Sequence, residues 1–202
     1  VIAFTEKIDI DVAKSLEGKF VEAVIAPGYD NDAIALLSKK KNLRILKLKK
    51  PISKPIDKKM IKQITGGMLV QEIDTQIIES WSVPTKTPFS ESKKELALFG
   101  IAAAKHTKSN AIVLVQEYED RQFRVLGMGA GQPNRVDALK KLSVSKAIEN
   151  LKEENPNVDD NEIKKIIGEC IFVSEAFFPF ADSIDSANEM GAKYLVQPGG
   201  SI

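Results

Sequence analysis

The stretch GMGAGQPNRV, Gly127 to Val136, separates a strand-like segment from a helix-like segment of this 202-residue chain. Its three glycines permit positive φ and a close approach of the backbone to a ligand. The helix that follows offers unpaired N–H groups and the positive end of its dipole to an anion. The stretch predicts a ligand-contacting loop, although glycine-rich turns between strand and helix also occur without a ligand.

Two further segments share this character. FFPFADS, residues 177–183, gathers three phenylalanines around Pro179 and then offers Asp182 and Ser183 before a helical pattern. QPGGSI, residues 197–202, follows the apolar run YLV. In open α/β sheets, ligands bind at the carboxyl ends of the strands. We therefore expect the three loops to converge on one crevice.

Apolar periodicity along the chain predicts an α/β fold. Strands are expected at 1–4, 21–26, 43–48, 68–73, 111–117, 123–128 and 171–173, and helices at 9–20, 31–39, 90–107 and 135–151. The segment KKPISKPIDKK, residues 49–59, is predicted to be a linker, because its prolines and lysines suit neither a buried strand nor a helix interior. The predicted domains are residues 1–60, which end one subdomain and include the linker, and residues 61–202, which form a second.

Composition narrows the function classes. The net charge is +1, and the lysine clusters carry no interleaved aromatic residues, so no nucleic-acid partner is expected. No apolar run reaches the roughly 18 residues of a membrane span, and no signal segment opens the chain. The single cysteine, Cys170, has apolar neighbours and is expected to be an inert core thiol. A cytoplasmic protein is predicted. The strand-like start at Val1 and the stop after a glycine turn indicate a fragment of a longer polypeptide.

Dinucleotide, nucleoside-triphosphate and zinc chemistry suit the glycine loop poorly. The spacing is GxGxG, not the GxGxxG of dinucleotide-binding folds, and the candidate acid, Glu149, lies in a helical segment. No GxxxxGK[ST] string occurs, which removes the main support for a kinase or ATPase. One histidine and one cysteine supply a zinc site poorly.

Five segments, in order, resemble the formyltransferase region of the bifunctional purine-biosynthesis family AICAR transformylase/IMP cyclohydrolase. They are VEAVIAPGYDNDAIALLSKKKNLRIL (21–46), KHTKSNAIVL (105–114), GMGAGQPNRVDAL (127–139), VSEAFFPFADSID (173–185) and GAKYLVQPGGSI (191–202). The resemblance runs nearly end to end. It implies cytidine-deaminase-like three-layer α/β/α domains with a mixed sheet and without zinc, because the deaminase signature HxE with PCxxC is absent.

The resemblance implies transfer of a formyl group from 10-formyltetrahydrofolate to the 5-amino group of AICAR in de novo IMP biosynthesis. That reaction needs a base for the amine proton, an acid for the departing folate nitrogen and donors for the developing oxyanion. Asn110 matches the last role, or holds the substrate carboxamide. Glu22 and Phe177 match nucleotide contacts. Each has a structural alternative. Asn110 would be a turn residue, Glu22 a surface carboxylate and Phe177 a core side chain.

On the folate side, the matching positions are Arg135, Val136, Asp182, Ser201 and Ile202. A carboxylate suits the adjacent donors of a pterin, and an apolar wall suits its faces. The alternatives are that Arg135 only begins a helix and that Asp182 only caps one.

The catalytic lysine–histidine pair of the family belongs to a motif upstream of the matched region. Lys105 and His106 belong to the separate KxTxSN motif, and His106 is expected to be a satisfied histidine at a helix C-terminus. The general base and acid are therefore expected outside this chain. The family also implies a homodimer with shared active sites. Two alternatives stay open: a non-catalytic folate- or nucleotide-binding module, and a dimer-assembly module.

Overall fold

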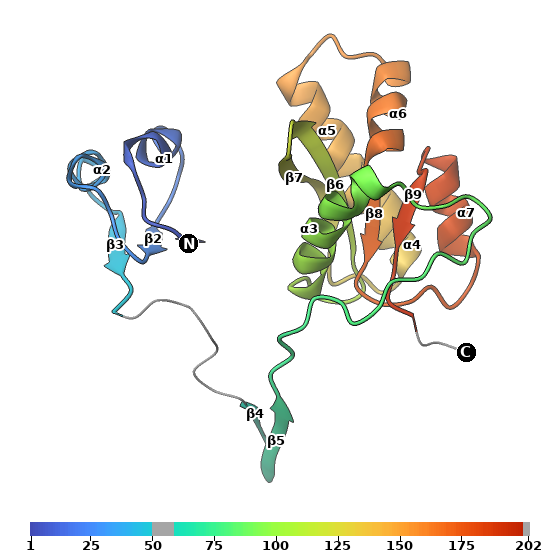
Figure 1. Cartoon of the computed structure of the whole chain (residues 1–202), viewed down its shortest axis with the longest axis horizontal. Helices are drawn as coiled ribbons and strands as arrows, with labels where there is room; N and C mark the ends of the chain where they lie inside the picture. The colour runs from blue at the N-terminus through green and yellow to red at the C-terminus, as the bar shows by residue number, and fades with distance from the viewer. Residues whose placement is uncertain (50–58, 200–202) are drawn as a thin grey trace. The chain divides into compact units, whose positions relative to one another are not determined.

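The chain folds as two compact units, Val1–Asp74 and Thr75–Ile202 (Figure 1). The computed structural model describes residues 1–49 and 59–199. Both units combine helices with strands, which confirms the predicted mixed α/β class. The linker predicted at 49–59 lies almost entirely outside the described residues. The subdomain boundary near residue 60 and the likeness to cytidine deaminases stay predictions.

The first unit is built on a parallel sheet of strand order β1-β2-β3. Its elements are β1 (Ile2–Ala3), α1 (Ile10–Ser15), β2 (Ala23–Ala26), α2 (Asn31–Leu37) and β3 (Arg44–Lys47). The carboxylate of Asp9 caps α1 by accepting from the N–H of Val12. Val24 and Ala26 are fully buried and share a core with residues of both helices. Both helices therefore cover the same face of this sheet.

A hairpin of β4 (Lys59–Ile64) and β5 (Gly67–Glu72) follows. The sequence predicts β5 one residue later, at 68–73, and does not predict β4. The turn between them consists of Thr65 and Gly66, and Gly66 has a φ of +83°. Asn-Gly and Asp-Gly are the strong sequence signals for such turns, and Thr-Gly is a weak one. The sequence therefore gives little sign of this hairpin.

The second unit contains a four-stranded mixed sheet of order β7-β6-β8-β9. Strand β6 is antiparallel to β7 and β8, and β9 is parallel to β8. The strands are β6 (Ile112–Glu119), β7 (Gln122–Gly129), β8 (Ile171–Ser174) and β9 (Tyr194–Val196). The helices are α3 (Lys94–Lys105), α4 (Arg135–Asp137), α5 (Ser145–Glu154), α6 (Asp160–Glu169) and α7 (Asp182–Glu189), with a 3₁₀ turn at Glu91–Lys93 and a π-helix, η2, at Ala138–Val144.

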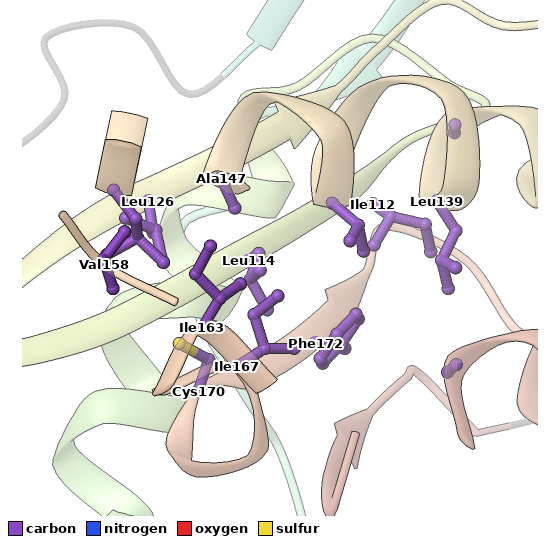
Figure 2. Packing of buried hydrophobic residues seen from close by; sticks show 14 residues of the cluster. Ile112, Leu114, Leu126, Leu139, Ala147, Val158, Ile163, Ile167, Cys170 and Phe172 are labelled. Carbon is purple, nitrogen blue, oxygen red and sulfur yellow. The ribbon is translucent and has the colours of Figure 1, made fainter. Parts of the chain in front are cut away.

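Alternating side chains of this sheet enter two separate cores. Val113 and Val115 of β6 pack with α3 on one face, whereas Ile112 and Leu114 pack with the helical elements on the other. Figure 2 shows Phe172 of β8 on that second face, in the same cluster as Ile163 and other helical side chains. Since both faces of the sheet are covered, this unit has three layers, α/β/α. The burial of four consecutive residues in β6 follows from this arrangement.

The glycines of the opening motif act differently from the prediction. Gly127 and Gly129 lie inside β7, and neither has a positive φ, whereas Gly131 in the loop has a φ of +65°. A Cβ on Gly127 would stand 2.0 Å from the carbonyl oxygen of Ser143, and one on Gly129 would stand 2.0 Å from that of Ala138. These two glycines therefore make room for the backbone of η2. Only Gly131 fits the prediction of a loop glycine that needs positive φ.

The spacing of the two contacting carbonyls matches the helix type. Ala138 and Ser143 are five residues apart, which equals the i→i+5 hydrogen-bond spacing of a π-helix. The side-chain hydroxyl of the buried Ser143 also faces the carbonyl oxygen of Gly127, at 3.4 Å. Elements α4, η2 and α5 follow one another without a break from Arg135 to Glu154, where a helix is predicted over 135–151.

We predict that Gly127→Ala destabilises the second unit by about 3 kcal/mol or more, because a backbone carbonyl cannot move aside as a flexible side chain can. Gly199→Ala is the control, since a Cβ at Gly199 meets nothing within 4 Å. Urea unfolding followed by the fluorescence of Trp81, the single tryptophan, reports on this unit. Equal midpoints for the two variants would contradict the packing role of Gly127.

Candidate functional site

Four strand ends meet at one edge of the sheet in the second unit. Ile112 begins β6 and lies opposite both Gly129, the last residue of β7, and Ser174, the last residue of β8. Val196 ends β9 and pairs with Val173 in the same region. Because β6 runs against its neighbours, its start lies beside their ends. The segment before β6 and the segments after β7, β8 and β9 therefore leave the sheet at one edge, while their convergence on one crevice stays a prediction.

Asn110 ties the segment before β6 to the glycine loop. Its Nδ2 donates to the carbonyl oxygens of Gln132, at 3.0 Å, and Pro133, at 3.1 Å. The main chains of Asn110 and Gln132 also exchange hydrogen bonds. Both amide hydrogens thus have acceptors in the loop, while Oδ1 has no hydrogen-bond partner among the described residues. The predicted oxyanion-donor role would require Asn110 to release one of these carbonyls, whereas the other predicted role, holding the substrate carboxamide, can use Oδ1.

Glu175 is the centre of the network, and the sequence did not single it out. It directly follows β8, and its side chain is 9% exposed. Its Oε1 accepts from the hydroxyl of Ser109 at 2.7 Å, the N–H of Ala111 at 2.9 Å and Nη2 of Arg135 at 3.1 Å. An acidic residue between a buried strand and an aromatic loop is the available signal. The three phenylalanines that follow it form a stronger local pattern and mask that signal.

Arg135 and Val136 open the helical run that follows the glycine loop. Asn134 is the N-cap of α4, and its side chain accepts from the N–H of Asp137 at 2.7 Å. The side chain of Arg135 is 15% exposed and pairs with Glu175, while its Nε is buried without a hydrogen-bond partner. Arg135 therefore begins a helix, as the structural alternative held, and is also bound into the site network.

The aromatic loop after β8 is held by two polar contacts. The N–H of Phe178 donates to Oε1 of Gln197, which joins this loop to the segment after β9. The hydroxyl of Ser174 donates to the carbonyl oxygen of Ala176 at 2.6 Å. Phe177 is 37% exposed. The structure thus gives Phe177 a partly exposed position at the sheet edge, where the other loops lie.

Asp182 is the first residue of α7, and the N-cap is Ala181. Its Oδ1 accepts from the N–H of Ser183 at 2.7 Å and from the hydroxyl of the same residue at 3.3 Å. The carboxylate is exposed, and α7 contacts α4, the helix that carries Arg135 and Val136. Asp182 satisfies a donor in the first turn and remains accessible to a ligand.

Three predicted residues lie outside the described part of the second unit. Glu22 belongs to the first unit, where its side chain is exposed and its carbonyl oxygen accepts from the N–H of Arg44. Ser201 and Ile202 lie outside the described residues. His106 is the C-cap of α3, which confirms its predicted place at a helix C-terminus.

The single cysteine lies away from the site, in the core. Cys170 is fully buried in the core, and burial raises the pKa of its thiol to about 12, so it is the inert core thiol that was predicted. The described residues bring no three His, Cys, Asp or Glu side chains together as a metal site. In the same ranges, no helix has the length and apolarity to cross a membrane.

Comparison with known proteins identifies the family. The sequence pattern of the AICARFT/IMPCHase bienzyme family matches residues 1–146. The chain belongs to this family. It is 42% identical over 202 residues to the bifunctional purine biosynthesis protein PurH of Petrotoga mobilis, 39% identical over 204 residues to that of Lactobacillus acidophilus and 38% identical over 203 residues to that of Persephonella marina.

All three matches cover 100% of this chain but only 35% to 36% of the relative. The chain thus spans about a third of the length of the PurH proteins it matches. The match confirms the resemblance seen in the sequence motifs, because it extends over the glycine loop and the segments after β8 and β9. The relatives are named for purine biosynthesis and for two functions.

Proposed function

We propose that this chain supplies part of the active site of a formyltransferase, which transfers the formyl group of 10-formyltetrahydrofolate to AICAR in purine biosynthesis. One observation carries the proposal. The segment before β6, the glycine loop and the start of the aromatic loop, which hold the family-like motifs, are joined by the hydrogen bonds of Asn110 and Glu175. Segments distant in sequence are thereby held at one sheet edge, where α/β proteins bind ligands.

On the nucleotide side, we assign Asn110, Phe177 and Glu22 to AICAR. The engaged Nδ2 of Asn110 orients its Oδ1, which is an acceptor suited to the amine or carboxamide N–H groups of AICAR. As the amine attacks the formyl carbon, its nitrogen becomes more positive and donates more strongly to that oxygen. A contact that strengthens in this way stabilises the transition state more than the bound substrate.

On the folate side, we assign Arg135, Val136, Asp182, Ser201 and Ile202. Asp182 offers an exposed carboxylate to the adjacent donors of a pterin, and Val136 offers an apolar surface. The general base and acid are expected from elsewhere in the complete protein. The protein is proposed to act in the cytoplasm.

The β4–β5 hairpin supports a further part of the proposal, a homodimer with shared active sites. The hairpin carries large apolar side chains on both faces, each 44% to 66% exposed, namely Met60, Ile61, Ile64, Met68, Leu69 and Val70. The cross-strand register places Ile61, Met68 and Val70 on one face and Met60, Ile64 and Leu69 on the other. A two-stranded hairpin alone is marginally stable in water. Burial against a second subunit would cover both faces.

The function is tested in the complete gene product with Asn110→Ala. We expect formyl transfer by the parent enzyme and a loss in kcat of about tenfold to a hundredfold in the variant, the range of one hydrogen bond to a charged group. Asn150→Ala is the control, because the Nδ2 of Asn150 also donates to a main-chain carbonyl, but to that of Leu126 inside β7, away from the loops. A parent that binds a folate or AICAR but transfers nothing would favour a binding module, and one that binds neither would favour an assembly module.

The folate assignment is tested with Asp182→Asn. We expect folate affinity to fall about tenfold to a hundredfold with little change for AICAR, because asparagine retains the acceptor for Ser183 but loses the charge. Asp185→Asn removes the same charge from the first turn of α7 and should leave both affinities unchanged. Calorimetric titration of both ligands decides. Unchanged folate affinity in Asp182→Asn would make this carboxylate a structural residue only.

The dimer assignment is tested with Ile61→Lys/Leu69→Lys, which places one charge on each face of the hairpin. We expect the dimer dissociation constant to rise on the order of a hundredfold or more, since each apolar side chain contributes about 1.5–3 kcal/mol when buried. Gln63→Lys/Gln71→Lys adds the same charges at polar positions of the two faces and is the control. Sedimentation velocity of the complete gene product measures the result. Equal dissociation constants in the two variants would exclude the apolar faces from the interface.

A further inference from the structure

Glu175 accepts hydrogen bonds from three places in the site at once. Ser109 and Ala111 lie before β6, and Arg135 opens the helical run after β7. Its Oε2 receives a second, longer contact of 3.3 Å from the same Nη2. The hydroxyl of Ser109, the N–H of Ala111 and the guanidinium of Arg135 all act as donors, so the side chain that they surround must be an acceptor. A nearly buried carboxylate meets that requirement.

One side of this network fixes Asn110. The residues directly before and after it, Ser109 and Ala111, are both bound to Oε1 of Glu175. The side chain of Asn110 is bound to the glycine loop. Its backbone is therefore held on one side and its amide on the other, which determines where its free Oδ1 lies.

The other side fixes Arg135. Among the described residues, Glu175 supplies the hydrogen-bond acceptors of its guanidinium, and the buried Nε has none. An arginine with 15% exposure has lost most of its hydration, so an opposite charge is needed nearby. Without Glu175, the guanidinium would turn toward water and leave its place at the start of α4.

We propose that Glu175 is a positioning residue that couples the two substrate subsites, the nucleotide side through Asn110 and the folate side through Arg135. This inference rests on the proposed formyltransferase function. The two sides depend on different properties of Glu175. Ser109 and Ala111 need only an oxygen acceptor, whereas Arg135 needs the negative charge and meets both carboxylate oxygens.

Glu175→Gln separates these properties. The amide oxygen at the position of Oε1 still accepts from Ser109, Ala111 and Arg135, but the charge is lost, and the new NH₂ group at the position of Oε2 faces Nη2 of Arg135 as a second donor. We expect KM for 10-formyltetrahydrofolate to rise about tenfold to a hundredfold, with KM for AICAR within about threefold of the parent. Ser109→Ala tests the opposite side. It should lower kcat about threefold to tenfold and leave the folate KM unchanged.

The experiment is two-substrate steady-state kinetics on the complete gene product, with the melting temperature of each variant. Glu189→Gln, which removes an exposed carboxylate paired with Lys140, is the control and should match the parent. The coupling role is supported if Glu175→Gln raises mainly the folate KM while Ser109→Ala lowers mainly kcat. Equal shifts in both KM values, or none, in Glu175→Gln overturn it. If Glu175→Gln does not fold, the result for Ser109→Ala decides, and an unchanged kcat overturns the role. A parent without formyl transfer refutes the proposed function itself.

Discussion

The site depends on a close contact between two backbones. Gly127 and Gly129 leave no side chain between β7 and the π-helix, so the carbonyl oxygens of Ser143 and Ala138 lie directly against the strand. The helical run begins only three residues before Ala138, at Arg135. The position of Arg135 is therefore set by packing between the sheet and the helical layer and not by the loop alone. Protein interiors are packed too densely for such a contact to shift without moving its neighbours.

The ion pair between Arg135 and Glu175 links this packing contact to the segments before β6 and after β8. Glu175 and Arg135 are 9% and 15% exposed, so neither charge is well hydrated. Removing one partner of such a pair is strongly destabilising, while replacing both by apolar residues is often neutral. The pair thus fixes geometry more than it adds stability. Exposed pairs differ: Lys146 and Glu149, at 56% and 59% exposure, are screened by water, contribute little to stability and fix nothing in the site.

Much of the fold could be predicted from the sequence because local patterns and burial agree. The run Ile112–Val115 is apolar throughout, as expected for a strand covered on both faces. Strand β4 could not be predicted, because its large apolar side chains are exposed and its turn lacks a strong signal. The role of Gly127 and Gly129 was also beyond the sequence. A strand glycine indicates that some group approaches closely, but not whether it is a ligand or a helix.

The sequence motifs identified the segments that form the site, but not the carboxylate of Glu175 that joins them. Asn110 and Arg135 could be named because they stand in family-like motifs, whereas Glu175 is recognised only by its partners from other segments. A hydrogen-bond network of this kind depends on tertiary contacts, and no local pattern in one sequence specifies them. Even for Asn110, the motif identified the residue but not which end of its amide is available.

Which end of the Asn110 amide is available decides which catalytic roles this residue can fill under the proposed function. The Nδ2 of Asn110 is held by two loop carbonyls, so this residue presents an acceptor, Oδ1, and Asp182 presents a second one. An oxyanion on the formyl carbon needs donors, and the attacking amine needs a base. Under the proposed function, these two acceptors orient the donor groups of AICAR and of the folate. The donors that stabilise the oxyanion and the group that removes the amine proton must then come from residues other than these two, as expected if the catalytic pair of the family lies elsewhere in the complete protein.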